Sequence, residues 1–280
     1  MVLDEDIVGA VITGQIDAVK AWLAADQSRV NDFATFPGSD MKFTLLAIAS
    51  TGMRDEAKLP LVRLLLAHGA DPSVYHHDSS SLTPLYIAAA CSARGEHTLE
   101  IVSTLLDAAP LERQIASGMT PLRSPIVQGF NTSGEFDVHR ERDALEVIKL
   151  LLRHGAPLDD YPNYSGDRPR FSAEATMRDG ETKFPGLARN EAFVEAKALI
   201  AGVRACGGSW KSYCRLPHKE VLRLRSLISR GRARPRREPI LERDILEKRA
   251  AAAYRSIVFL CKLGDNGVVW KILEFWQATR

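Results

Sequence analysis

Short apolar runs recur along the first 160 residues, with the three- and four-residue spacing of a helix that buries one face. Residues 61–70 have the sequence LVRLLLAHGA, residues 147–156 have the sequence VIKLLLRHGA, and residues 101–110 (IVSTLLDAAP) repeat the pattern more loosely. Each run predicts an amphipathic helix. Because the same pattern returns at intervals, the sequence predicts a fold assembled from similar helical units.

A glycine marks the end of the two clearest runs. Gly69 and Gly155 each follow a histidine and precede an alanine. Glycine can adopt the left-handed backbone conformation that closes a helix, which a residue with a Cβ atom reaches only at a cost. We therefore expect both helices to end at these glycines and the chain to reverse direction there.

Threonines mark the expected helix starts. Thr83 and Thr120 are each followed by Pro-Leu, and Thr44 is followed by Leu-Leu. Threonine is a good N-cap and proline suits the first position of a helix, so each threonine predicts the start of a short helix. The three threonines are 39 and 37 residues apart, which is enough for a turn and two helices with a small insertion.

These helix starts and helix ends together resemble ankyrin repeats, whose period is about 33 residues. A first unit precedes them, because Gly14 separates two apolar helical patterns within residues 7–23. We therefore expect an all-α fold, an ankyrin-type helical repeat solenoid of at least four units over residues 3–160 with a C-terminal helical extension. The alternative is that the leucines form the core of another all-helical bundle.

The sequence departs from the ankyrin pattern at two points. The histidine that usually follows Thr-Pro-Leu is replaced by Ala47, Tyr86 and Arg123, so the comparison with the family implies a weakened hydrogen-bond network between neighbouring turns. Residues 129–142 are rich in glycine, asparagine, serine and charge, and they predict an insertion between the two helices of the fourth unit.

The rest of the chain lacks the repeated pattern. Residues 161–189 contain scattered prolines, glycines and charges without a helical period, and we interpret them as a loop or linker. Residues 190–280 predict a basic helical region, which begins with a degenerate repeat or cap. One further helix is expected from Pro217 to just before Gly231, and a last one from about Asp265. A cap is expected because the final repeat would otherwise expose an apolar face.

Charge is distributed unevenly along the chain. The formal net charge is +2, but residues 1–160 contain 13 Lys and Arg against 22 Asp and Glu, whereas residues 161–280 contain 24 against 13. Arginines cluster in residues 215–237, and clustered arginines bind nucleic acid or acidic lipid through charge alone. The alternative is a solvated helix face or a segment that lies on the acidic half of the same chain. The candidate polyanion-binding residues are Arg223, Arg225, Arg230, Arg232, Arg234, Arg236 and Arg237.

Residues 263–276 (LGDNGVVWKILEFW) are similar to the opening of an F-box, the helical module that links a substrate receptor to a ubiquitin ligase, although the proline that usually follows the first leucine is missing. The similarity implies a substrate receptor whose partner is a ubiquitin-ligase subunit. The alternative is a Trp-rich helix that packs on the core of its own chain.

The short motifs of known catalytic mechanics do not occur in the sequence, which lacks GxGxxG, the phosphate loop, GxSxG and HExxH. We expect no enzyme activity and no cofactor. No metal site is expected either, because the metal-capable side chains do not have the spacing of zinc ligands. These side chains are His76, His77, Asp78, Cys206, Cys214 and His218.

The first six residues carry three acidic and no basic side chains, unlike a secretory signal, and no apolar run approaches the roughly 20 residues of a membrane span. The expected location is cytoplasmic or nuclear. The expected function is that of an interaction scaffold or adaptor, which binds a partner protein through its turns and the first helices of its repeats. The candidate partner-binding residues are Tyr75, His77, Tyr86 and Arg123.

Overall fold

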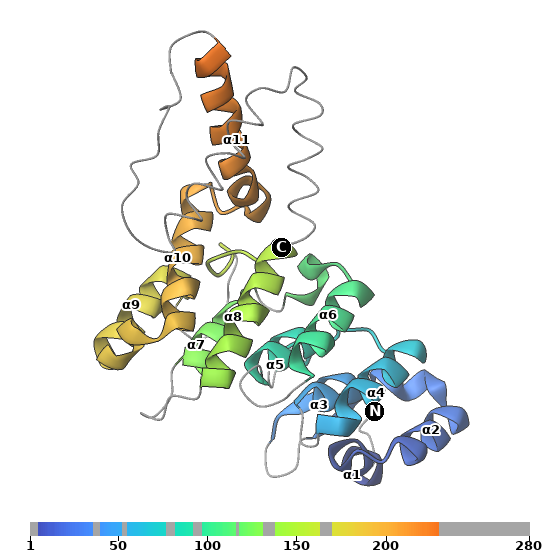
Figure 1. The fold of residues 1–280 in the computed structure, drawn as a ribbon. Coiled ribbons are helices and arrows are strands. Elements are labelled where there is room, and N and C mark those ends of the chain that lie inside the picture. The colour runs from blue at the N-terminus through green and yellow to red at the C-terminus, as the bar shows by residue number, and fades with distance from the viewer. Residues whose placement is uncertain are drawn as a thin grey trace. The chain divides into compact units, whose positions relative to one another are not determined.

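The structure is a computed structural model, in which the chain divides into two units, Met1–Ser209 and Trp210–Arg280. The residues that it describes are 5–35, 40–51, 55–76, 82–91, 97–115, 118–130, 138–162 and 170–229. The described residues are mostly helical (Figure 1), which confirms the predicted all-α class.

The helices of the first unit form consecutive pairs, and the members of each pair contact each other. The pairs are α1 (Glu5–Thr13) with α2 (Ile16–Ala25), α3 (Leu45–Thr51) with α4 (Asp55–Ala67), α5 (Pro84–Ala90) with α6 (Thr98–Ala108), α7 (Arg123–Phe130) with α8 (Val138–Arg153), and α9 (Ala173–Lys183) with α10 (Glu191–Ala205).

Short elements lie between the helices. In the described residues the 3-10 helices are η1 (Gln27–Asn31), η3 (Leu111–Gln114) and η4 (Pro185–Arg189). Two strands, β1 (Phe33–Thr35) and β2 (Lys42–Thr44), pair antiparallel with Phe33 opposite Thr44. This hairpin leads directly into α3.

Successive pairs pack side by side in two rows (Figure 1). In the first row α1 contacts α3, α3 contacts α5, α5 contacts α7 and α7 contacts α9. In the second row the same order holds for α2, α4, α6, α8 and α10. Each pair therefore covers an apolar face of the pair before it, which a single pair of short helices could not bury alone.

The core consists of leucines at equivalent places in successive pairs. Leu46, Leu85 and Leu122, each two residues after a helix-starting threonine, have no exposed surface. In the second row Leu65, Leu105 and Leu151 are also completely buried. Full burial of such a side chain contributes about 1.5–3 kcal/mol, so the repeated leucines supply much of the drive to stack.

Glycines close the second-row helices as the sequence predicts. Gly69 and Gly155 have positive φ angles of 88° and 87°. After them the Ala70 amide donates to the Leu65 carbonyl at 3.0 Å, and the Ala156 amide donates to the Leu151 carbonyl at 3.0 Å. This bond from the residue after the glycine satisfies a carbonyl that the helix end would leave open.

The threonines act at the helix starts, though not identically. The hydroxyl oxygen of Thr83 accepts from the Tyr86 amide at 3.3 Å, and that of Thr44 accepts from the Ala47 amide at 3.2 Å. The hydroxyl of Thr120 accepts instead from the Leu122 amide at 3.3 Å, and α7 begins only at Arg123. The start predicted directly after Thr120 is therefore too early.

The loop predicted over residues 161–189 is wrong for residues 173–183, which form α9. The sequence signal is weak because α9 buries only Ala173 and Met177 and contains Gly180. Contacts with α7 and α10 stabilise α9, although its local sequence has no clear apolar face. The sequence predicts one degenerate unit or cap after residue 190, whereas α9 and α10 form a full helix pair.

The expected insertion at 129–142 is also shorter than predicted. Gly129 and Phe130 belong to α7, and α8 begins at Val138. Gly129 allows the two helices to approach closely, since a Cβ atom there would lie 2.3 Å from the Cβ of Ala144. A glycine that suggests a loop in the sequence therefore serves helix packing.

In the second unit the structure describes α11 (Trp210–Ser229). The helix predicted to start at Pro217 begins seven residues earlier, at Trp210. The helix predicted from about Asp265 lies outside the described residues. Within the described part of the chain, no helix has both the length and the apolar character required to cross a membrane.

The close approach of α7 and α8 gives a stability prediction. Gly129→Ala should destabilise the fold by roughly 1–3 kcal/mol through overpacking, although alanine favours a helix. The matched control is Gly9→Ala in α1, where a Cβ atom meets nothing within 4 Å, so a gain of roughly 0.5–1 kcal/mol is expected. Urea unfolding followed by circular dichroism measures both, and equal shifts of the same sign would show the packing argument to be wrong.

Candidate binding surfaces

The turns of neighbouring helix pairs are joined by side-chain hydrogen bonds. Asn31 donates from Nδ2 to the Gly69 carbonyl at 3.2 Å and accepts at Oδ1 from the Asp71 amide at 2.8 Å. Gln27 donates from Nε2 to the His68 carbonyl at 2.8 Å. Because these bonds link residues about 40 positions apart, they fix how one pair is placed on the next.

Asp71 also organises its own turn. Burial alone would raise the pKa of its carboxyl, but hydrogen bonds from the hydroxyl and amide of Ser73 hold that pKa below its ordinary value. Its Oδ2 lies 3.4 Å from Nη2 of Arg113, in the turn of the next pair. Both side chains of this ion pair are substantially exposed.

A buried ion pair joins the last turns. The Asp160 carboxylate has no exposed surface and accepts from Nη1 of Arg123 at 3.1 Å. It also accepts from the amides of Thr120 at 3.0 Å and Phe171 at 2.9 Å. The Arg123 guanidinium lies 5.7 Å from the centre of the Phe171 ring. The expected weakening of the network is therefore wrong at Arg123, because this arginine forms its own link to the next turn.

The candidate contact residues lie in different environments. Tyr86 and Arg123 have the same place in their pairs, three residues after a threonine, and their helices α5 and α7 are in contact. Tyr75 is half-buried in the segment after α4, and His77 lies outside the described residues. The Arg123 side chain is only 13% exposed and is held by Asp160, so its main role is inside the fold.

An open groove crosses the second row of helices. Its volume is about 450 Å³, and α4, α6 and α8 each contribute side chains to it. Leu99 and Leu150 are its apolar residues, and charged residues surround them. The lining consists of Arg63, Leu99, Glu100, Ser103, Thr104, Asp107, Glu146, Leu150 and Arg153.

The charges of the groove are only partly paired. Glu100 lies 3.1 Å from Nδ1 of His97, and Glu146 lies 2.8 Å from Nζ of Lys149. Arg63 and Asp107, in contrast, have no hydrogen-bond or ion-pair partner among the described residues. Among the described residues, the groove therefore offers Arg63 as a free cation and Asp107 as a free anion. Two opposite charges can fix the orientation of a polar partner.

This groove was not predicted from the sequence. Its residues come from three helices that are about 40 positions apart in the sequence. Residues that meet in the groove are therefore far apart along the chain. Leu64, Thr104 and Leu150 occupy the same position of the repeated pattern, but only the structure shows that all three are half-buried rather than buried. A partly exposed position in an otherwise buried helix marks the outer face of the row.

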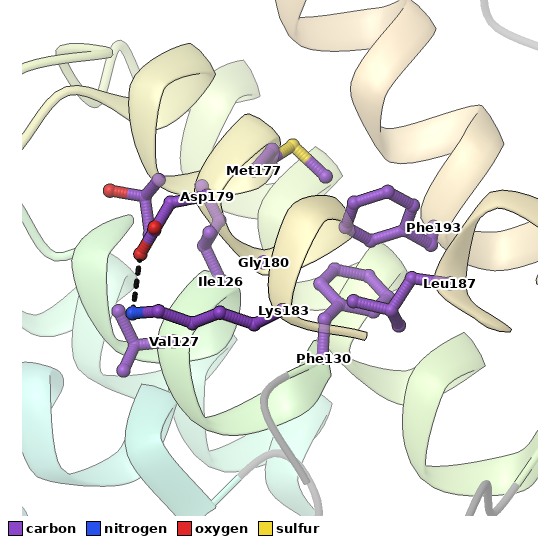
Figure 2. A pocket seen from close by; sticks show the side chains of 10 residues that line it. Ile126, Val127, Phe130, Met177, Asp179, Gly180, Lys183, Leu187 and Phe193 are labelled. Carbon is purple, nitrogen blue, oxygen red and sulfur yellow. Dashed lines mark hydrogen bonds and ion pairs between the residues drawn. The ribbon is translucent and has the colours of Figure 1, made fainter. Parts of the chain in front are cut away.

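A second cavity, between α7, α9, η4 and α10, is much smaller (Figure 2). Its volume is about 40 Å³, too small for the ligand pockets of several hundred Å³ found in enzymes. The rings of Phe130 and Phe193 meet edge to face at 5.4 Å, and Lys183 reaches Asp179 at 2.7 Å. This space is a packing gap at the junction of the last two pairs.

A cluster of three charges fastens the last pair. Arg204 in α10 contacts both carboxylate oxygens of Asp159 and both of Glu174, each at 2.7 Å. Its hydrogen bonds lower the pKa of the Asp159 carboxyl and that of Glu174, and the two carboxylates in turn raise the pKa of Arg204. The cluster joins the turn after α8 to α9 and α10.

Lys149 makes a further bridge between α8 and α10. Its Nζ lies 2.8 Å from Glu146 in the same helix and 2.8 Å from Glu195 in α10. Burial alone would lower the pKa of Lys149, but its hydrogen bonds to these two carboxylates hold that pKa above its ordinary value.

Metal-capable side chains do not converge in the described part of the chain, where no group of three such residues could hold an ion. His76 packs edge to face on Phe33 at 5.0 Å. Cys206 and Cys214 are free thiols that belong to different units. The side chains of His77, Asp78 and His218 are not described.

Most of the candidate polyanion-binding residues lie beyond the described chain. Arg223 is exposed on α11, and Arg225 belongs to α11 with its side chain not described. Outside the described residues lie the F-box-like segment 263–276 and Arg230, Arg232, Arg234, Arg236 and Arg237.

The sequence has no significant match to any protein-family model or to any curated protein. The ankyrin resemblance therefore depends on the residues of this chain and their arrangement alone.

Removal of the buried arginine should cost more than removal of an exposed one. Arg123→Met leaves the Asp160 carboxylate buried without its cation, and a loss of about 3 kcal/mol in the free energy of unfolding is expected. Arg113→Met removes the exposed pair with Asp71 and should cost at most about 1 kcal/mol. Denaturant titration of both variants checks this, and equal losses would contradict the structural role of Arg123.

The Arg204 cluster predicts a dependence of stability on pH. Asp159 and Glu174 have lower pKa values in the folded chain than in the unfolded chain, so their contribution is present above about pH 4 and is lost as the pH falls through the folded-state values. The stability difference between the wild type and Arg204→Gln should therefore be largest near neutral pH and shrink in acid. Thermal unfolding between about pH 3 and pH 7 measures it. A difference that stays constant over this range is the contrary result.

Proposed function

We propose that the helix pairs are ankyrin-type repeats and that the protein is an interaction scaffold or adaptor that binds a partner protein through them. The observation that carries the proposal is the packing of the pairs in two rows. Each pair adds a similar turn and similar helix faces beside those of its neighbour, so the chain builds one extended surface from repeated parts.

Several features support the ankyrin interpretation. The capping threonines Thr44 and Thr83 are 39 residues apart, Gly69 and Gly155 close second-row helices with positive φ, and side-chain hydrogen bonds join turns about 40 residues apart. The β1–β2 hairpin occupies the connection between the first two pairs. The pair α9–α10 extends the repeated unit beyond the predicted boundary at residue 160.

The groove across α4, α6 and α8 is the best-supported contact surface. It is open, it contains two apolar side chains between charges, and its free Arg63 and Asp107 can orient a partner through opposite charges. The volume of about 450 Å³ can accept side chains of a partner protein. Tyr75 and Tyr86 remain proposed contacts on the side of the turns and first-row helices, while Arg123 supports the fold of that side. His77 remains a candidate from the sequence alone, because it lies outside the described residues.

A second candidate function is polyanion binding by α11. The observation in its favour is that Lys211, Arg215, Lys219 and Arg223 are all exposed. The ubiquitin-ligase receptor hypothesis has no such observation, because its segment lies outside the described residues.

The scaffold proposal is tested by blocking the groove. In the variant Ser103→Arg/Asp107→Arg, two long side chains of one sign fill the groove, and recovery of specific partners in affinity purification should fall at least about 10-fold. The matched control Glu56→Arg/Ala175→Arg makes the same change in net charge at exposed helix positions outside the groove and should retain them.

A third variant, Tyr75→Ala/Tyr86→Ala, reports on the side of the turns. Loss of the same partners in this variant, with normal recovery in the groove variant, would move the binding surface to that side. If all three variants recover the same proteins as the wild type, the scaffold proposal is wrong for both surfaces. Circular dichroism confirms that each variant is folded.

A further inference from the structure

Helix α11 carries a regular line of positive charge. Lys211, Arg215, Lys219 and Arg223 recur every four residues, and all four side chains are exposed. At a rise of about 1.5 Å per residue, neighbouring members are about 6 Å apart along the axis, and the line is about 18 Å long. We call these four residues the cation row.

The cation row is not neutralised by its own chain as far as the structure describes it. No hydrogen bond or ion pair joins any of the four side chains to another described residue. Elsewhere in the described chain, Lys149, Lys183 and Arg204 lie at 2.7–2.8 Å from carboxylates. Four adjacent unpaired cations repel one another, and an anionic partner removes that cost.

The apolar side of α11 is opposite to the cation row. With 3.6 residues per turn, Trp210, Tyr213 and Cys214 share the face of the helix that lies farthest from the four cations. Trp210 and Tyr213 are half-buried, with ring centres 5.7 Å apart. By the same spacing, Leu222 lies on the same side of the helix as the cation row, and Leu216 lies at the edge of that side. A flat surface can therefore meet the cations or the aromatic face, but not both.

This opposition decides between three kinds of polyanion. A helix that lies in an anionic membrane inserts its apolar face and keeps its cations at the lipid headgroups, but Trp210 and Tyr213 on the apolar face of α11 are already half-buried within the chain. A single-stranded nucleic acid is bound by cations together with stacking aromatic side chains, and here the aromatics are on the other face. The phosphate backbone of a duplex requires only cations along a line.

We propose that the cation row of α11 binds the phosphate backbone of double-stranded nucleic acid without reading its sequence. This inference rests on the polyanion-binding candidate function and is independent of the groove and its partner protein. The arginines of residues 230–237 follow α11 directly in the chain and add to the same positive charge.

The test measures binding of the full chain to a labelled random-sequence DNA duplex by fluorescence anisotropy between about 50 and 200 mM salt. Neutralising all four residues to glutamine (Lys211→Gln, Arg215→Gln, Lys219→Gln, Arg223→Gln) should reduce the slope of log K against log salt by about four, since each lost phosphate contact removes about one. At the lowest salt the affinity should fall by more than about 10-fold.

The matched control neutralises four exposed arginines of the first unit that lie outside the groove, Arg142, Arg170, Arg178 and Arg189, also to glutamine. Its net charge equals that of the cation-row variant, so it should keep the wild-type slope. An equal loss in both variants would show that net charge is responsible and would overturn the cation row. A cation-row variant that binds like the wild type overturns it as well.

Two further measurements keep the result interpretable. Binding to phosphatidylserine vesicles that depends on the row, without duplex binding, would retain polyanion binding but overturn the nucleic-acid inference. No binding to either overturns both. If the quadruple variant loses helix content in circular dichroism, Arg215→Gln and Lys219→Gln are measured singly, each with an expected slope change of about one.

Discussion

The fold depends on the burial of apolar faces between successive helix pairs. Each pair has helices of only 7 to 16 residues, and a single pair exposes too much apolar surface to be stable alone. Leu46, Leu85 and Leu122, at or just before the starts of first-row helices, are fully buried, and successive first-row helices contact one another. The two rows, the groove and the regular succession of turns all follow from this requirement.

Hydrogen bonds and charges then determine how the pairs are placed on one another. Apolar contact alone tolerates sliding, whereas Asn31 and Asp160 each bind two or more groups at fixed positions in a neighbouring turn. The pairing of Asp160 with Arg123 is costly to break, since its carboxylate has no access to water. Polar links between turns thus fix the placement of one pair on the next, and the buried leucines hold the stack together.

The proposed binding regions of the chain differ in charge and in construction. The groove on the second row combines both charges and needs three helix pairs to form, so it suits a partner with a specific shape. The cation row needs one helix and acts through charge alone. The groove residues belong to the acidic half of the sequence, and the cation row belongs to the basic half.

The sequence by itself determined the helical class and the residues at which several helices start and end. Glycine at Gly69 and Gly155 and threonine at Thr44 and Thr83 act locally, through backbone conformation and capping, so their effects can be predicted without knowing any neighbour. The interaction scaffold and the polyanion site remain hypotheses that the sequence raised.

Only the tertiary structure decided the features that depend on distant residues. Helix α9 forms because α7 and α10 cover it, Gly129 serves helix contact instead of a loop, and Arg123 is held by a carboxylate 37 residues away. The groove likewise needs α4, α6 and α8 side by side. These outcomes were not predictable from local pattern, because a side chain's burial and partner depend on which helices stack beside it, and spacing along the chain does not specify those contacts.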